Sequence, residues 1–241
     1  MTLARQVYRR RLYQQIADDI ERLILDGTYL PDSRLPSEQE LAGTYGVSRN
    51  VIREALKSLK ELGLVSIRTG SGTYVRPPTA KPISEAMHRF IQHSGSGISF
   101  LQLYEARRII EPDCTRLAAQ RASDDDLNQI RASLQTMEGH RHDPQVTTQA
   151  DLDFHLGIAA ATDNPLMPSL LDPIIAPLNK LLRTSYVSHP FLIESGLEDH
   201  QRIFATLQDH DADQAYQEML RHLVKGEREL LELGVTQEAL F

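Results

Sequence analysis

The sequence predicts a mostly helical protein in two parts: an N-terminal winged helix-turn-helix with a small β-hairpin, then an all-helical bundle. Three observations predict this fold class. Apolar residues recur at helical spacing along most of the chain, one pair of short strand-like runs occurs, and a proline-rich stretch follows that pair. This stretch, residues 77–82, favours an extended chain and predicts a linker between domains at residues 1–76 and 83–241.

The distribution of charge agrees with this division. The net charge of the 241 residues is −7, but residues 1–76 hold 12 basic and 9 acidic side chains, whereas residues 77–241 hold 14 and 24. A modestly basic module is therefore joined to an acidic body. Cys114 is the single cysteine, and no run is apolar enough for a membrane span or a signal peptide. We expect a cytoplasmic protein without a membrane partner.

The N-terminal domain is expected to contain three helices. Apolar residues recur at three- and four-residue steps over residues 8–26 and predict the first. Ser37 and Glu40 form a capping box that begins the second helix, and a glycine-containing turn at residues 45–47 ends it. A third helix at residues 48–62 completes a helix-turn-helix pattern.

The third helix has two faces of different character. One face is apolar and is expected to pack inward: Ile52, Ala55, Leu56, Leu59 and Leu62. The first turn, which Ser48 is placed to cap, is crowded with polar side chains: Ser48, Arg49, Asn50 and Arg53. In a recognition helix this turn meets base edges, where Arg can bind guanine and Asn can bind adenine bidentately. The alternative is a basic face that meets only solvent.

Two short strands are expected directly after this helix, at residues 65–68 and 73–75, with a Gly- and Ser-rich turn at residues 69–72 between them. A glycine-rich tip allows the backbone to approach a phosphate or enter a minor groove, and Arg68 lies at the base of the tip. The alternative is an ordinary surface hairpin. The position of the hairpin directly after a helix-turn-helix favours a DNA-binding wing.

Residues 8–76 resemble the winged helix-turn-helix of the GntR family of bacterial regulators. The matching stretches are residues 35–38, 45–56, 63–65 and 70–73. The resemblance implies that the following residues contact DNA: Arg34, Ser48, Arg49, Asn50, Arg53 and Gly70. One position departs from the family, which often has a DNA-contacting Arg where this chain has Gln39. A neutral side chain there can still bind a phosphate or a base, with a smaller salt-dependent share of the affinity.

Helical periodicity dominates the rest of the chain and predicts a bundle of six or seven helices. Capping boxes begin helices at Ser99 and Ser123, and an Asn-Pro pair at residues 164–165 begins another. The expected helices are residues 99–121, 123–139, 147–162, 165–187, 191–209 and 211–233.

One aspartate and three histidines are placed on the inward faces of these helices. Asp151 and His155 are four residues apart and project from one face, while His200 and His222 lie on stripes of two other helices. Asp153 points to a different side. Buried charge and imidazole need partners, and such a set suits a transition-metal ion. The alternative is three separate core histidines satisfied by carbonyls or water. The six other histidines are expected at the surface.

The C-terminal part resembles the helical effector domain of the FadR subfamily of the same family. The stretches that resemble it are residues 104–112, 117–119 and 151–155, with His200 and His222. The resemblance extends over about residues 82–233 and is loose outside the stretches just named. It implies a bound divalent metal, with Zn expected and Ni or Mn as alternatives, whose ligands match Asp151, His155, His200 and His222. Members without a metal bind fatty acyl thioesters and lack this aspartate and these histidines.

Arg107 shares a helix face with apolar residues, whereas Arg108 points about 100° away. An arginine on an apolar stripe needs an anion. One interpretation is an ion pair with a core carboxylate. The other is an effector site, in which Arg107 and open metal positions together hold the carboxylate of an organic acid.

These features predict a transcriptional regulator, a repressor that binds a palindromic operator as a homodimer and is released or reoriented by a small carboxylate-bearing effector. Two alternative functions are also compatible with the sequence. Asp and His around a metal with open positions can also activate water, as in a metal-dependent hydrolase or oxygenase. The C-terminal domain can also serve dimerisation alone, which predicts no pocket. We find no Glu or second His placed as a general base, and expect no enzymatic activity.

Overall fold

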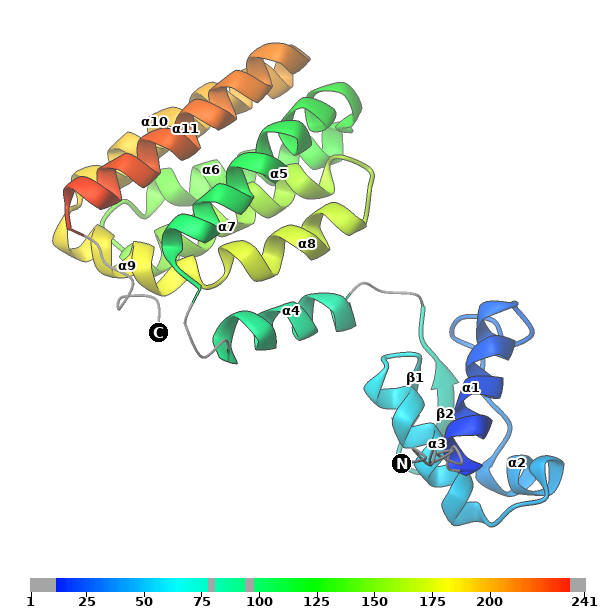
Figure 1. Cartoon of the computed structure of the whole chain (residues 1–241). Helices are drawn as coiled ribbons and strands as arrows, with labels where there is room; N and C mark the ends of the chain where they lie inside the picture. The colour runs from blue at the N-terminus through cyan, green and yellow to red at the C-terminus, as the bar shows by residue number, and fades with distance from the viewer. Residues whose placement is uncertain (1–11, 78–80, 94–97, 235–241) are drawn as a thin grey trace, which may run out of the picture. The chain divides into compact units, whose positions relative to one another are not determined.

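The computed structural model describes residues 12–77, 81–93 and 98–234. The chain forms two compact units that divide between Pro82 and Ile83, and each is described by itself. Figure 1 shows the elements of both units. None of the helices in the described ranges is long and apolar enough to cross a membrane.

The N-terminal unit contains the expected helices and hairpin: α1 (Leu12–Leu25), α2 (Glu38–Tyr45), α3 (Arg49–Glu61), β1 (Val65–Arg68) and β2 (Gly72–Val75). The start of the first expected helix, residues 8–11, lies outside the described part of the chain. The two strands are antiparallel, with Arg68 opposite Gly72, so residues 69–71 form the tip of the hairpin. The winged helix-turn-helix is therefore present as predicted.

Local signals explain the ends of the helices in this unit. The Ser37–Glu40 capping box begins α2, and Gly46 ends it in the left-handed conformation at φ 65°. Ser48 occupies the N-cap position of α3, but its side chain makes no capping hydrogen bond. Leu62 is 52% exposed, so the prediction that it packs inward is wrong. It lies just beyond α3, where the buried stripe of the helix has ended.

The helical unit has more helices than expected. They are α4 (Lys81–His93), α5 (Phe100–Arg121), α6 (Asp124–Gly139), α7 (Pro144–Ala160), α8 (Leu166–Ile175), α9 (Leu178–Ser188), α10 (Phe191–Gln208) and α11 (Ala212–Glu232). Helix α4 was not anticipated. The single helix expected at residues 165–187 is divided into α8 and α9, because Pro177 between them has no N–H to continue the hydrogen-bond ladder.

Helix α4 also corrects the expected linker. It begins at Lys81, so the last two residues of the 77–82 stretch are helical, and residues 78–80 lie outside the described part. Proline is compatible with this start because Pro82 lies in the first turn, where a missing N–H breaks no helical bond. Ser84 and His88 of α4 both contact the carboxylate of Asp172 in α8, at 2.7 and 3.0 Å.

The starts of α5 and α6 follow the predicted capping signals, and the start of α7 differs from its prediction. Ser99 and Ser123 begin the predicted capping boxes at α5 and α6. Helix α7 begins at Pro144 rather than at residue 147, because Asp143 accepts hydrogen bonds from two backbone N–H groups of its first turn.

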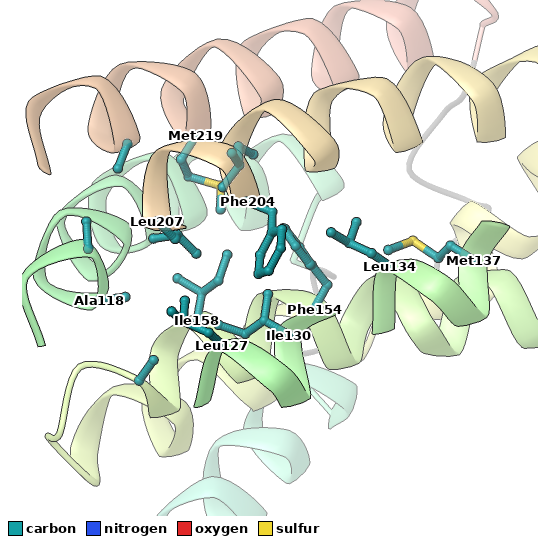
Figure 2. Close-up of a cluster of buried hydrophobic side chains, with 14 of the residues drawn as sticks. Ala118, Leu127, Ile130, Leu134, Met137, Phe154, Ile158, Phe204, Leu207 and Met219 are labelled. Carbon is teal, nitrogen blue, oxygen red and sulfur yellow. The ribbon is translucent and has the colours of Figure 1, made fainter. Parts of the chain in front are cut away.

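The main core of this unit lies among α5, α6, α7, α10 and α11. Figure 2 shows Phe154 and Ile158 of α7 close to Phe204 and Leu207, and none of these side chains is more than 7% exposed. The ring of Phe154 also packs on His200, with 4.5 Å between the ring centroids. The apolar core therefore lies directly beside His200, a buried polar side chain.

Candidate functional sites

The side chains predicted to contact DNA are all exposed. They lie before and within α2, in the first turn of α3 and on the hairpin: Arg34, Gln39, Ser48, Arg49, Asn50, Arg53, Arg68 and Gly70. On the opposite face of α3, Ile52, Ala55 and Leu56 are buried. Helix α3 is thus held to its unit by one face and presents polar side chains on another.

Arg53 makes a contact that the sequence analysis missed. Its Nε and Nη2 donate hydrogen bonds to the two carboxylate oxygens of Glu38 in α2, at 3.3 and 2.9 Å. The hydrogen bond from Arg53 lowers the pKa of Glu38. Both side chains remain partly exposed, at 53% for Arg53 and 37% for Glu38. The partners are 15 residues apart, and no local spacing indicates their pairing.

The tip of the hairpin is shaped by glycine and by Tyr74. Gly70 adopts φ 74°, a conformation that favours glycine, and a side chain there would meet no neighbouring atom. The guanidinium of Arg68 lies over the ring of Tyr74, 4.5 Å from its centroid, and the Tyr74 hydroxyl is 2.8 Å from that of Ser71. Arg68 is therefore held close to the hairpin.

In the helical unit, three histidines from three helices meet. His155 of α7, His200 of α10 and His222 of α11 each offer a ligand atom, and these three atoms lie within 4.8 Å of one another. Asp151 lies one turn before His155, and its Oδ1 is 3.5 Å from Nε2 of His200. The structure therefore brings together all four predicted ligands. Asp153 is exposed, as expected, and accepts a hydrogen bond from Gln149.

These histidines have buried nitrogens without hydrogen-bond partners. Both ring nitrogens of His200 and Nδ1 of His222 are buried and accept or donate no hydrogen bond within the described ranges. Burial, followed by the charges of neighbouring groups, lowers the pKa of His222 to about 3 and that of His200 well below its ordinary value. Neutral imidazole is the form that binds metals. The donor set thus fits a divalent metal ion.

Arg107 is 3% exposed and has a core carboxylate as its partner, which is the first of the two interpretations of its position. Its Nε lies 2.5 Å from Oε1 of Glu111, one turn along α5, and its Nη2 lies 3.2 Å from Nε2 of His155. The other oxygen of Glu111 is 2.5 Å from Nδ1 of His155. Burial alone would raise the pKa of Glu111, but the charge of Arg107 and the contact with His155 lower it to about 2.

A cavity opens beside this cluster, with about 40 Å³ available to water-sized molecules. Arg107, Asp151, His155 and His222 line it, together with residues that the sequence analysis did not select: Tyr104, Tyr186, Asp199 and Glu229. Sequence spacing did not indicate these four residues, because contacts between helices bring such side chains to the cavity. Asp199, for example, is held by Lys225 at 2.9 Å and lies 3.7 Å from Nδ1 of His222. Such contacts depend on how α10 and α11 dock.

Comparison with known proteins identifies both units. Residues 12–75 match the family of bacterial regulatory proteins named gntR, and residues 102–225 match the FCD domain. The HTH-type transcriptional regulator LutR of Bacillus subtilis is 31% identical over 85% of this chain and 94% of its own length. This chain belongs to the GntR family. The resemblance found in the sequence is thereby confirmed.

Other relatives of this GntR regulator support the same family assignment. The galactonate operon transcriptional repressor of Escherichia coli is 26% identical over 91% of this chain and 96% of its own length. Among solved structures, Streptococcus agalactiae GntR matches 90% of this chain and 100% of its own, with 30% identity and a TM-score of 0.68. The protein is a DNA-binding, effector-responsive transcriptional regulator. Its family and relatives are regulators rather than enzymes, which counts against the hydrolase or oxygenase alternative.

Proposed function

We propose that this GntR regulator is a repressor whose helical unit senses a small carboxylate-bearing metabolite at a metal site. The observation that supports the proposal best is the set of partnerless imidazole nitrogens of His200 and His222, next to His155 and Asp151. A buried polar atom without a partner costs free energy, and a metal ion bound by these residues would remove that cost.

The metal is expected to be Zn, with Ni or Mn as alternatives, because imidazole and one carboxylate suit these ions. When bound by four protein ligands or fewer, such an ion can keep a position for the carboxylate of an effector. His200 and His222 are held neutral by their surroundings, so these two side chains need not lose a proton before they bind the ion.

The chemistry of the cavity supports a hydroxylated organic acid as the effector. Arg107 and the metal would bind the carboxylate. Tyr104 and Tyr186 line the same cavity, and a tyrosine hydroxyl can donate to or accept from hydroxyl groups of the ligand. A relative named for galactonate, a hydroxylated acid, is consistent with this class.

On the DNA side, we propose that a homodimer binds a palindromic operator. One α3 helix would enter each half-site, and the half-sites would be about one helical turn apart. Arg49, Asn50 and Arg53 would meet base edges, while Ser48 and Arg34 would bind phosphates. The hydroxyl of Ser48 is exposed and not used for capping, which supports this assignment.

The metal site is tested by Zn²⁺ affinity, measured by competition with a chromophoric chelator. We expect His155→Ala to lower this affinity by at least about 100-fold, since one of few ligands is lost. His140→Ala, which changes an exposed histidine at the end of α6, serves as the matched control. Equal affinity in the parent and in His155→Ala would refute the metal site.

Effector sensing is tested with the same proteins in a thermal-shift screen of hydroxylated acids, with and without chelator. A true effector should raise the melting temperature of the parent only when Zn²⁺ is present, and should change binding to an operator selected from random duplexes. An acid that stabilises His155→Ala as well as the parent would contradict the proposal.

A further inference from the structure

Arg107 lies between a predicted metal ligand and a buried carboxylate. Its Nη2 is 3.2 Å from Nε2 of His155, and its Nε is 2.5 Å from Oε1 of Glu111. All three side chains are at most 4% exposed. Arg107 also lines the cavity beside the histidines. A single guanidinium thus contacts a ligand nitrogen, an anion and the space where an effector would bind.

These contacts determine which nitrogen of His155 holds the proton. A guanidinium has only donors, so the Nε2 that faces Arg107 must accept and cannot bear a hydrogen. The hydrogen is then on Nδ1, which lies 2.5 Å from Oε2 of Glu111. This contact is close although its angle is not that of a well-aligned hydrogen bond. Without a proton between them, two electronegative atoms at this distance would repel each other.

Nε2 in this tautomer has one lone pair, and it can serve one partner at a time. We propose that Arg107 and a divalent metal ion compete for Nε2 of His155, while Glu111 holds His155 in the tautomer that presents this nitrogen. The inference rests on the metal site of the proposed function. It makes Glu111 a positioning residue, because a carboxylate behind a ligand histidine orients the ring and raises its basicity.

Displacement of Arg107 from Nε2 of His155 by the metal ion would also affect effector binding. When the ion takes Nε2, one N–H donor of Arg107 loses its acceptor while Glu111 still holds the guanidinium by Nε. Because Arg107 lines the cavity, the freed donor becomes available to the carboxylate of an incoming acid. Metal and effector would then bind with positive coupling.

Zn²⁺ affinity of the full chain tests the competition, because the two partners of the ion pair should respond in opposite directions. We expect Arg107→Gln to bind Zn²⁺ about tenfold more tightly, since a competing charge-assisted hydrogen bond is removed. Glu111→Gln should bind about 10- to 100-fold more weakly, since the ring loses its orienting carboxylate. An ion pair with only a structural role predicts weaker binding in both variants.

Two controls separate competition from simpler effects. Lys225 is a second cation near the cluster, but it contacts Asp199 rather than a histidine nitrogen. A gain in Lys225→Gln equal to that in Arg107→Gln would reduce the effect to long-range repulsion and overturn the proposal. Glu105→Gln changes an exposed carboxylate of the same helix and should leave Zn²⁺ affinity unchanged.

Two further measurements test the proposal even if Arg107→Gln does not fold. The double variant Arg107→Gln/Glu111→Gln leaves no unpaired charge and should bind Zn²⁺ more tightly than Glu111→Gln alone; no gain overturns the competition. Nitrogen-15 NMR of the chelator-treated parent should find His155 protonated at Nδ1, and protonation at Nε2 overturns the tautomer. A parent that binds no Zn²⁺ defeats the proposed metal site as well, whereas binding without opposite shifts defeats only this inference.

Discussion

Each unit contains an arginine–glutamate pair, and the two pairs differ in almost every physical respect. Arg53 and Glu38 join α3 to α2 at the surface of the DNA-binding unit, with side chains that are 53% and 37% exposed. Arg107 and Glu111 lie inside the helical unit, with side chains that are 4% and 2% exposed. Water screens the first pair, whereas the second depends on its partners for all its solvation.

The difference reflects where each unit holds its candidate functional groups, at the surface or in the interior. In the DNA-binding unit, polar side chains stand on an apolar core and can leave their partners for a phosphate or a base at little cost. In the helical unit, the candidate functional groups are part of the interior. The buried pair is tied to His155, so a change in one member affects the others.

The largest expected effect comes from breaking the buried pair. Glu111→Ala should lower the free energy of unfolding of the helical unit by about 3–5 kcal/mol, because the charge of Arg107 is left buried and unpaired. Glu38→Ala should change the stability of the DNA-binding unit only slightly. Calorimetry together with hydrogen exchange can follow the two units separately. Similar losses in both units would mean that burial does not distinguish the two ion pairs.

The next effect is the pH dependence of the helical unit in the presence of chelator. The folded-state pKa values of His200 and His222 are lowered, so the unfolded chain binds more protons once the pH falls below about 6.5, the ordinary histidine pKa. Stability should therefore decrease from pH 6.5 towards the folded pKa, which is about 3 for His222. The slope should reach about 1.4 kcal/mol per pH unit for each histidine.

The control for this prediction is a pair of glutamine variants. His222→Gln should show a shallower decrease of stability between pH 6.5 and 5, whereas His140→Gln, at an exposed position, should behave as the parent does. A slope that stays the same in His222→Gln would mean that this histidine is not held neutral by the fold.

A smaller effect is expected when the exposed face of α3 is changed. Arg49→Ala should weaken binding to a selected operator by about 5- to 150-fold, the range of one base contact, and should leave the melting temperature unchanged. Arg22→Ala removes an exposed arginine of α1 and serves as the control. Gel-shift titrations at fixed salt measure both. Equal losses in the two variants would point to a general charge effect rather than recognition.

The smallest effect tests whether the surface pair is as free as its exposure indicates. Glu38→Gln removes the partner of Arg53 and one negative charge near the DNA, so operator affinity should rise by about two- to tenfold at low salt. The dependence on salt should also become steeper. Weaker binding would instead mean that Glu38 holds Arg53 in the orientation needed for contact.

Local signals in the sequence were sufficient for much of the fold. The capping boxes at Ser37, Ser99 and Ser123 begin helices as predicted, because a cap involves only residues within one turn. The same holds for the hairpin and for the buried stripe of α3, apart from Leu62. Helix α4 and the break at Pro177 were missed.

The two-part architecture, the family and the helix faces that carry the predicted metal ligands all follow from the sequence alone. Each of these follows from spacing along one helix or from a contiguous motif. The folded structure was needed to find that the four predicted ligands converge, that Glu111 joins Arg107 to His155, and that Arg53 pairs with Glu38. Such contacts depend on how separate helices dock, and docking is set by the packing of whole faces rather than by the order of neighbouring residues.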